Sequence, residues 1–240
     1  MTELTFASYN VHKAVGSDRR RDPERILAVI DQLGADVVGL QEVDLRLGPR
    51  ASVFERSRLE HLGWQLASVP MKPASLGWHG NMLLVREGLT IDAVDAVHLP
   101  RLEPRGALTA SLQQDGQPIR VTSMHLDLSG LRRKAQLAHL CAAGRASGQP
   151  VLMLGDLNAW LSRPDRLRGL HDYWSVLTPG RSFPARGPLL SLDRMIVSPH
   201  WRCEHLEVFR SPLAREASDH LPIRAKLTLD AQNLGTAPTQ

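Results

Sequence analysis

Four apolar residues in a row, at 151–154, are followed by Gly155, Asp156 and Asn158. An uninterrupted apolar run of this length that ends at a glycine is typical of a strand buried on both faces. Polar side chains directly after such a strand emerge at the edge of a rigid core, which holds them in fixed positions. Asp and Asn are also common in turns, so this stretch alone fits an ordinary strand and turn equally well.

The same arrangement of an apolar run followed by polar residues recurs along the chain. An alternating run at 4–11 predicts a strand, and a second strand is predicted at 36–40. Between them, Asp22 and Pro23 are a typical helix start, and Gly34 is a typical helix end. Further strands are predicted at 64–69, 82–85, 89–97, 107–112, 119–124, 190–197, 204–209 and 221–229.

Helical periodicity is found in two further segments. A short helix is predicted at 55–62, and a longer amphipathic helix at 129–145 directs five side chains to the core: Leu131, Ala135, Leu137, Ala138 and Leu140. Asp115-Gly116 is a hairpin turn signal between two strands. Residues 162–173 are helical or irregular, 181–188 form a loop, and 230–240 a loose tail. Strands alternating with a few helices indicate an α/β or α+β chain.

Composition limits the class of protein. The chain has 240 residues, of which 42% are hydrophobic, and no linker or repeat divides it, so we expect one catalytic domain at 1–229 followed by the tail. No apolar run is long enough to span a membrane, and the first residues do not resemble a signal peptide, which predicts a cytoplasmic protein. Cys141 and Cys203 lack metal-ligand spacing and are expected to be buried free thiols.

The net charge is +4, and the surplus is locally concentrated in arginine-rich runs such as 19–21 and 132–134. A basic balance suits a phosphate-bearing partner, although the same runs fit an ordinary solvated surface. Aromatic residues are not interleaved with these charges as they are in single-strand binders. Trp64 and Trp78 are expected in the core, and Trp160 either in the core or at the border of a cleft.

Eight polar residues lie at or near predicted strand ends: Asn10, Glu42, His125, Asp156, Asn158, Asp193, Asp219 and His220. Carboxylates that share a cleft repel one another unless a cation or a proton neutralises them. Oxygen ligands without cysteine favour Mg²⁺ or Mn²⁺ over zinc. A histidine with an acidic neighbour is held in one tautomer and can stabilise a developing oxyanion. If these strand ends converge, the set suits metal-assisted phosphoryl chemistry.

The motifs around these residues resemble those of the endonuclease/exonuclease/phosphatase superfamily, which has the deoxyribonuclease-I-like fold. The resemblance covers residues 4 to about 229 and rests on six motifs in order: Tyr9-Asn10-Val11, Leu40-Gln41-Glu42-Val43, Met124-His125-Leu126, Gly155-Asp156-Leu157-Asn158, Leu192-Asp193-Arg194 and Ser218-Asp219-His220-Leu221-Pro222. The fold it implies is a four-layer α/β/β/α sandwich. Two mixed β-sheets pack face to face, with helices on the outer faces.

The resemblance also implies a divalent metal site. Glu42 is similar to the family's main metal ligand, and Asn10 and Asp219 are expected close to the ion. The implied cofactor is Mg²⁺, for which Mn²⁺ can substitute. Three further residues are candidates for substrate binding: Asn81, Arg105 and His12. For Arg105 a surface salt bridge is an equal alternative, and His12 fits an ordinary loop histidine.

The catalytic roles follow from the same resemblance. Asp156 resembles the residue that orients or deprotonates the attacking water, and Asn158 the group that contacts the scissile phosphate. His220, with Asp193 behind it, resembles the histidine that stabilises the transition state. His125 would contact or protonate a phosphate oxygen. Family members assign the base differently between Asp156 and His220.

Together these features predict a Mg²⁺-dependent phosphoesterase, first of all a phosphodiesterase or nuclease acting by in-line attack of water. The alternatives are a phosphatase or phospholipase-type hydrolase of a small or lipid-derived phosphate ester, and a binding module that holds a phosphate ligand without turnover. The expected partner is the phosphate-ester substrate, either nucleic acid or a small or lipid phosphodiester. The sequence contains no feature that indicates an obligate protein partner.

Overall fold

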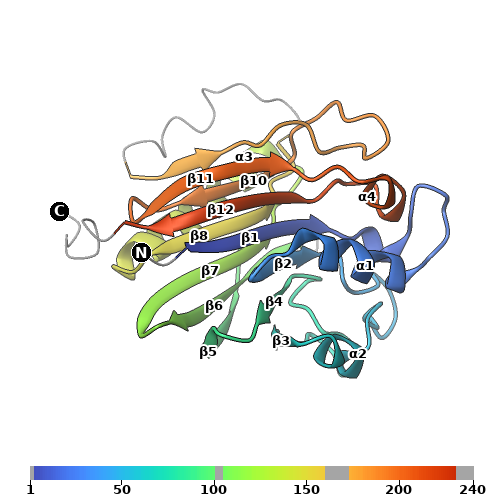
Figure 1. The fold of residues 1–240 in the computed structure, drawn as a ribbon, viewed down its shortest axis with the longest axis horizontal. Coiled ribbons are helices and arrows are strands. Elements are labelled where there is room, and N and C mark those ends of the chain that lie inside the picture. The colour runs from blue at the N-terminus through green and yellow to red at the C-terminus, as the bar shows by residue number, and fades with distance from the viewer. Residues whose placement is uncertain (1–2, 101–104, 160–172, 231–240) are drawn as a thin grey trace.

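Two β-sheets, each with an apolar face turned toward the other, form the centre of the molecule (Figure 1). The computed structural model describes residues 3–100, 105–159 and 173–230. Within these residues the first sheet has the order β11-β12-β1-β2-β4-β3. Its strands are β1 (Glu3–Asn10), β2 (Val37–Gln41), β3 (Trp64–Ala67), β4 (Met82–Arg86), β11 (Trp201–Val208) and β12 (Ile223–Leu229).

The second sheet has the order β5-β6-β7-β8-β10-β9. Its strands are β5 (Thr90–Val97), β6 (Gly106–Gln114), β7 (Gln117–His125), β8 (Val151–Asp156), β9 (Ser175–Leu177) and β10 (Asp193–Val197). Both sheets are mixed, because β1 and β2 run parallel, as do β7 and β8, while the other neighbours are antiparallel.

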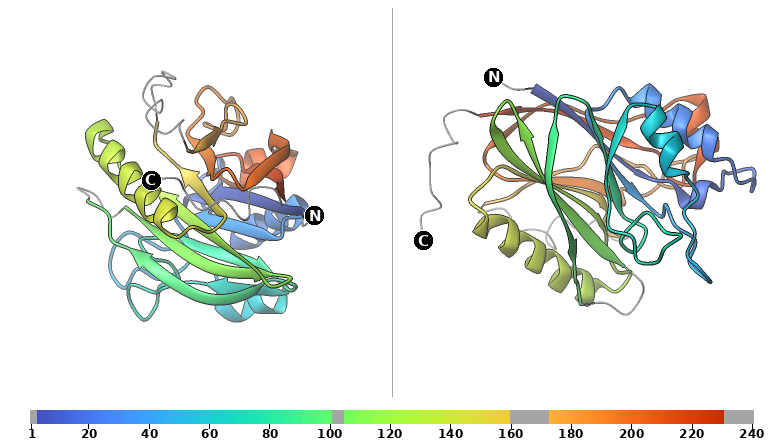
Figure 2. Two further views of the ribbon diagram at one scale, coloured as in Figure 1. Left: turned by 90° about the vertical axis from the view of Figure 1, so that its left-hand side faces the viewer. Right: turned by 90° about the horizontal axis from the view of Figure 1, so that it is seen from below.

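Helices cover the outer faces of this sandwich (Figure 2, left). The first sheet carries α1 (Pro23–Leu33) and α4 (Pro212–Ala217), and α3 (Gly130–Ala146) lies across the outer face of the second sheet. A short α2 (Arg56–His61) packs beside β3, and a single 3₁₀ turn, η1 (His12–Ala14), follows β1. This architecture confirms the predicted four-layer sandwich.

The contact between the two sheets is very close where β2 crosses β8. A Cβ atom on Gly39 would lie 1.9 Å from Leu154 Cδ1, so any larger residue at this position would force the Leu154 side chain to move. Gln41 Nε2 donates to Ser123 Oγ across the interface at 3.2 Å, and Ser123 Oγ donates to Leu40 O at 3.2 Å. The two sheets are therefore fixed relative to each other by a packing constraint and by hydrogen bonds.

Local sequence signals explain the element ends. Asp22 caps α1 by accepting a hydrogen bond from Arg25 N at 3.0 Å, and Gly34 ends it with a left-handed φ of 55°. The predicted hairpin is present, because Gln114 pairs with Gln117 across the two-residue turn formed by Asp115 and Gly116. Both turn residues have positive φ, as this tight turn requires.

The predicted core face of the long helix is wrong in part. Leu131 is 81% exposed, and Ala135 and Ala138 are exposed as well. The helix instead buries Gln136, Leu137, Leu140 and Cys141. Gln136 defines this face, because it accepts from Asp127 N at 2.9 Å and donates to Pro100 O at 3.0 Å. A buried glutamine with paired polar atoms replaced the apolar residues that simple periodicity favours.

Other differences are smaller. The strands predicted at 190–197, 204–209 and 221–229 begin at Asp193, Trp201 and Ile223. Cys141 is buried, but Cys203 is only half-buried, because it lies on the edge strand β11. The predictions for Trp160 and for residues 162–172 and 231–240 lie outside the described residues. In the part of the chain that the structure describes, no helix has the length and apolarity needed to cross a bilayer.

Candidate active site

Seven of the predicted site residues come together at one edge of the sandwich, where both sheets end. In the first sheet, Asn10 lies at the end of β1 beside Gln41 of the parallel β2, so that Glu42 follows at the same edge. In the second sheet, His125 pairs with Asp156, and Asp156 pairs with Asp193. Asp219 and His220 precede β12 and approach from the first sheet. The site is thus divided between the two sheets.

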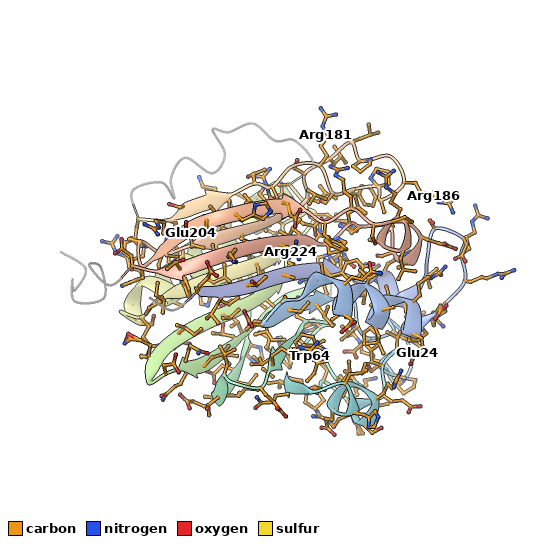
Figure 3. All side chains as sticks on the ribbon, in the orientation of Figure 1. Glu24, Trp64, Arg181, Arg186, Glu204 and Arg224 are labelled. Atoms are coloured by element: carbon orange, nitrogen blue, oxygen red, sulfur yellow. The ribbon has the colours of Figure 1, made fainter. Side chains whose placement is uncertain are left out.

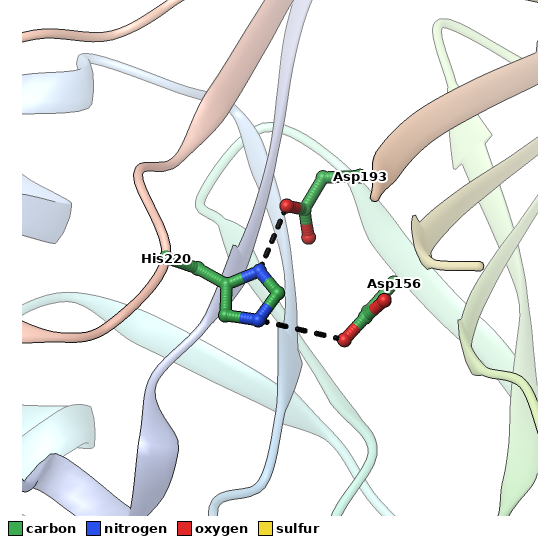
Figure 4. A group of neighbouring side chains, drawn as sticks. All are labelled: Asp156, Asp193 and His220. Carbon is green, nitrogen blue, oxygen red and sulfur yellow. Dashed lines mark hydrogen bonds and ion pairs between the residues drawn. The ribbon is translucent and has the colours of Figure 1, made fainter. Parts of the chain in front are cut away.

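A buried chain of hydrogen-bonding groups crosses from one sheet to the other (Figure 4). His220 Nδ1 lies 2.8 Å from Asp193 Oδ2, and Ser182 Oγ donates to the same carboxylate oxygen at 2.5 Å. On the other side of the ring, His220 Nε2 lies 3.7 Å from Asp156 Oδ2. The Phe183 ring packs against the imidazole, with ring centroids 4.8 Å apart. The imidazole is therefore fixed in position and orientation.

Electrostatics favour a protonated His220 beside a charged Asp156, while burial raises the pKa of Asp193. Burial alone lowers the pKa of His220, but the charges of Asp193 and Asp156 outweigh it and raise the pKa to about 10. For Asp156, burial acts to raise the pKa, and the neighbouring His125 and His220 more than reverse this, so its pKa lies below the ordinary value. At neutral pH the imidazole carries a proton and Asp156 is an anion.

The Asp156 carboxylate is oriented by three neighbours. Asn10 Nδ2 donates to Asp156 Oδ2 at 3.1 Å, and Asn158 N donates to Asp156 Oδ1 at 2.8 Å. His125 Nε2 lies 3.3 Å from Asp156 Oδ2. Asn158 is itself held, because its Nδ2 donates to Leu126 O at 2.9 Å. This arrangement fixes an anionic oxygen in one direction, as a proton acceptor requires.

Glu42 forms the second charged centre, and cations surround it. Its Oε2 pairs with Lys13 Nζ, and its Oε1 lies 3.8 Å from Arg105 Nη1. Burial raises the pKa of Glu42, yet the charges of His125, Lys13 and Arg105 outweigh burial and hold it at about 2. Lys13 is bound twice, because its backbone N also donates to Glu42 O at 3.0 Å.

A pocket opens beside Glu42 and is rich in cationic side chains. Its lining residues are Lys13, Glu42, Asp44, Arg46, Arg50, His79, Gly80, Arg105 and His125. Asp44 is buried and accepts from Leu76 N and Gly77 N at 3.0 Å each, which ties the segment after β2 to the segment before β4. Such a pocket complements an anion with several oxygen atoms.

Arg105 is not a surface residue, contrary to the salt-bridge alternative. Its side chain is buried, and its guanidinium contacts both ring nitrogens of His125, with Nη1 2.9 Å from Nδ1. Asn81 is fully buried and donates to Trp78 O at 3.1 Å and to Gly106 O at 3.2 Å. It lies behind the pocket lining, so the expected substrate contact of Asn81 stays a prediction.

His12 and Asp219 lie together at the margin of the site. His12 Nδ1 donates to Val15 O at 3.0 Å and lies 3.8 Å from Asp219 Oδ1. The His12 backbone N donates to Asn10 Oδ1 at 3.1 Å. Both ends of the Asn10 carboxamide therefore have protein partners, one of which is Asp156.

The sequence analysis did not identify several of the lining residues. One of them, Lys13, pairs directly with Glu42. A signal was present, because Lys13 directly follows His12 in the loop after Asn10. Arg46, Arg50 and His79 belong to none of the sequence motifs. The backbone gives a further signal. Nine non-glycine residues in the described ranges have positive φ, and six of them belong to the site or line its pocket: His12, Lys13, Glu42, Arg50, His79 and Asn158. Strained conformations of this kind concentrate where the surroundings enforce a functional geometry.

Two groups of side chains are candidates for a divalent cation. In the described residues, one group of three His, Asp or Glu side chains brings all its ligand atoms within 4.8 Å: Asp156, Asp193 and His220. Because Nδ1 of His220 and Oδ2 of Asp193 are already joined by a hydrogen bond, this group fits a proton relay better. Glu42 offers a charged carboxylate that faces a pocket, and Mg²⁺ and Mn²⁺ prefer such oxygen ligands. The donor set at Glu42 thus fits a hard cation.

Comparisons with known proteins agree with this geometry. The family model described as "Endonuclease/Exonuclease/phosphatase family" matches residues 7–220. The uncharacterized protein YbhP of Escherichia coli K12 is 32% identical over 165 residues, which cover 64% of each chain. Thus the match spans less than two thirds of that relative's length.

Solved structures show the same fold at low identity. An endonuclease/exonuclease/phosphatase from Bacteroides vulgatus has a TM-score of 0.78 at 15% identity and covers 96% of this chain and 100% of its own. TDP2 of D. rerio, complexed with a single-strand DNA product, has a TM-score of 0.74 at 16% identity, covering 95% and 100%. The chain therefore belongs to the endonuclease/exonuclease/phosphatase family.

Proposed function

We propose that this protein is a Mg²⁺-dependent phosphodiesterase that hydrolyses its substrate by in-line attack of water. The observation that carries the proposal is the buried chain Asp193–His220–Asp156, which places an imidazole with a raised pKa 3.7 Å from an oriented carboxylate. A binding module gains nothing from an anion held beside an anionic ligand. An enzyme needs such a group to accept a proton from water.

A divalent cation, when bound at Glu42 with Asp219 and Asn10 nearby, would supply positive charge opposite the phosphate oxygens. The chain's own residues account for the remaining steps. Asp156, oriented by Asn10 and by Asn158 N, accepts the proton of the attacking water. Asn158 contacts the scissile phosphate from the same loop.

His220 is assigned to the developing charge on the phosphoryl group. Its Nε2–H is directed toward the space beside Asp156, while Nδ1 is held by Asp193. A protonated imidazole at this point stabilises the oxyanion of the pentacovalent transition state. Asp193 acts through His220, because it fixes the ring and keeps it charged.

His125 and Arg105 are assigned to phosphate binding. The guanidinium lies against the His125 ring and 3.8 Å from Glu42 Oε1, so it can donate to a phosphate oxygen that enters the pocket beside Glu42. Both side chains line the pocket, whereas Asn81 and His12 do not. Asn81 and His12 are retained as outer contacts of the substrate.

The substrate test is a hydrolysis panel with Mg²⁺, with Mn²⁺ and with a chelator. The substrates are a soluble chromogenic phosphodiester, a phosphomonoester, single-stranded DNA, single-stranded RNA and phospholipid vesicles. The single-strand arm is included because a similar structure holds a single-strand DNA product. A preference for the monoester would replace the proposal by a phosphatase.

Asp156→Asn is the matched variant for this panel, because the amide keeps the shape of the side chain and removes the proton acceptor. Asp95→Asn, on the exposed surface of β5, is the control. We expect metal-dependent cleavage of a diester that falls by about 10²–10⁴-fold in Asp156→Asn and is unchanged in Asp95→Asn. Equal rates in both variants would refute the assignment.

A further inference from the structure

Leucines are exposed at the edge of the sandwich that holds the site. Among the described residues, five large hydrophobic side chains are exposed, and all five are leucine: Leu47 (85%), Leu62 (36%), Leu128 (45%), Leu131 (81%) and Leu189 (68%). Single exposed leucines are common on protein surfaces. Here four of the five lie on segments that border the active site, and this grouping requires an explanation.

The topology brings these four leucines to one end of the molecule. Leu47 follows Glu42 after β2, Leu128 and Leu131 follow His125 after β7, and Leu189 precedes Asp193 of β10. These strand ends meet at the site edge, because β7 and β8 end together and β10 begins there. In Figure 1 the segments before β10 and after β2 extend toward the right-hand end, where β1 and β2 finish.

Leu62 lies at the other end and provides an internal comparison. It follows α2 and lies two residues before β3, whose first residue, Trp64, pairs with Arg86 at the end of β4. The opposite end of β4, at Met82, pairs with Leu40 beside the site. A leucine of equal size and partial exposure is thus available far from the active-site edge.

The segments that carry or adjoin the four leucines are strongly basic. We define the rim as residues 43–54, 68–81, 126–134 and 178–192. Its basic residues are Arg46, Arg50, Lys72, Arg132, Arg133, Lys134, Arg181 and Arg186. Its two carboxylates, Asp44 and Asp127, are buried, so the exposed charge of the rim is entirely positive. Arg181 and Arg186 extend outward at the upper right of Figure 3.

Three of the four rim segments are tied to neighbouring parts of the site edge by side-chain contacts. Lys72 Nζ donates to Gly48 O at 2.9 Å, and Arg50 Nη1 contacts Met71 Sδ at 3.7 Å, which joins two of its segments. Arg133 Nη1 donates to Asn158 O at 2.8 Å, which joins a third to the catalytic loop. Leu47, Leu128 and Leu131 therefore lie on segments that are anchored at the site edge, with basic residues beside them.

We propose that the rim docks on an anionic lipid surface and that the substrate is a phosphodiester headgroup presented there. The substrate part of the proposal rests on the proposed function; the docking part does not. Aliphatic side chains enter the boundary between headgroups and acyl chains, while Arg and Lys bind the anionic headgroups around them. Because Arg46 and Arg50 of the rim also line the pocket, docking would bring a headgroup phosphate close to the site.

A nucleic acid is the less suitable partner for this surface. Phosphate backbones would suit the basic residues, but bases stack on aromatic rings or guanidinium planes rather than on leucine. The exposed large hydrophobic side chains of the described residues include no aromatic ring. The leucines therefore distinguish a lipid surface from a single-stranded nucleic acid.

The test is co-sedimentation with vesicles, using the full chain. Vesicles contain phosphatidylcholine with or without phosphatidylglycerol, and a single-stranded DNA oligonucleotide is the competitor. The test variant combines Leu47→Gln, Leu131→Gln and Leu189→Gln, and the control is Leu62→Gln. Exposed leucines contribute little to the core, so both variants should fold.

We expect the wild type and Leu62→Gln to bind the anionic vesicles, and the triple variant to bind at least about tenfold more weakly. Failure of the wild type to bind, or equal binding by the triple variant, would overturn the docking proposal. If the oligonucleotide binds the wild type and the triple variant equally well and displaces the vesicles, a nucleic acid is the partner instead.

Hydrolysis of the soluble diester separates the two proposals. It should be equal in the wild type and the triple variant, because the substituted leucines do not line the pocket. Vesicle binding without hydrolysis of any diester would refute the proposed function and leave the docking surface standing. Hydrolysis of a diester without vesicle binding would refute the docking proposal and leave the proposed function standing.

Discussion

Replacement of Asp193 by asparagine should change the pH range in which the enzyme works. The carboxylate holds His220 Nδ1 at 2.8 Å, and Ser182 Oγ donates to the same oxygen. An asparagine oxygen can replace Asp193 Oδ2, which keeps the ring in place. Its NH₂ group then takes the position of Oδ1, which is buried without a hydrogen-bond partner. The substitution therefore removes the charge and buries an unpaired donor.

The size of the effect follows from the burial of the pair. Both side chains are almost inaccessible, with 6% and 2% of their surface exposed. Loss of one partner of a buried ion pair costs about 3–5 kcal/mol, and a change of one in pKa corresponds to about 1.4 kcal/mol, so the pKa of His220 should fall by roughly 2 to 4. In the wild type that pKa is about 10. The imidazole of the variant then loses its proton near neutral pH.

The assay is the rate of diester hydrolysis as a function of pH, with an NMR titration of the histidines alongside. If a protonated His220 stabilises the transition state, the wild-type rate is maintained as pH rises until about 10. In Asp193→Asn the alkaline decline should begin roughly 2 to 4 pH units lower. The pH dependence of stability has the same direction as that of the rate. A histidine with a raised folded pKa stabilises fully below its unfolded value near 6.5, and this contribution is lost as pH rises through about 10.

An unchanged alkaline decline in Asp193→Asn would refute the reasoning, provided that the variant folds. Thermal unfolding monitors the fold, and Asp95→Asn on exposed β5 controls for a change of charge alone. A uniform loss of rate at every pH would also count against the argument. That result would mean that Asp193 only positions the ring and does not set its charge.

Three further outcomes are expected. Lys13→Met should bind Mn²⁺ a few-fold more tightly than the wild type in calorimetry without substrate, because Lys13 Nζ competes for the Glu42 carboxylate. Lys72→Met is the control, and weaker Mn²⁺ binding by Lys13→Met would contradict the prediction. Glu42→Gln should weaken Mn²⁺ binding by more than about tenfold in the same measurement, whereas unchanged binding would move the metal site elsewhere. Gly39→Ala should lower the free energy of unfolding by about 1–3 kcal/mol in denaturant titration, because its Cβ would lie 1.9 Å from Leu154 Cδ1; a neutral result would show that the sheets can separate.

The fold was largely predictable because its signals are local or shared by the family. Asp22, Pro23 and Gly34 set the limits of α1, and Asp115-Gly116 set the hairpin. The face of α3 was not predictable, because Gln136 is buried by hydrogen bonds to the backbone at Asp127 and Pro100, which are distant contacts. The hydrophobic periodicity of a sequence describes the helix by itself and contains no information on such partners.

The candidate site was predictable only where a strand carries its residue to the edge. Asp156 and His125 lie at strand ends, and their pairing follows from parallel register. Lys13 reaches Glu42 through three consecutive left-handed residues, a conformation that residue preferences do not favour. For Arg105 the sequence left phosphate binding and a surface salt bridge as equal alternatives, because its burial depends on His125 and Glu42, which are separate from it in the sequence.

Because the site is divided between the two sheets, catalytic activity reports whether the two sheets have assembled. Neither sheet holds a complete set: Asn10, Glu42 and His220 come with the first sheet, and Asp156 and Asp193 with the second. Two contacts, Asn10 to Asp156 and His220 to Asp193, exist only after the sheets have docked in their final register. During refolding, recovery of activity should therefore mark the completion of docking rather than the formation of either sheet. A fragment that contains one sheet would fold at best into an inert half.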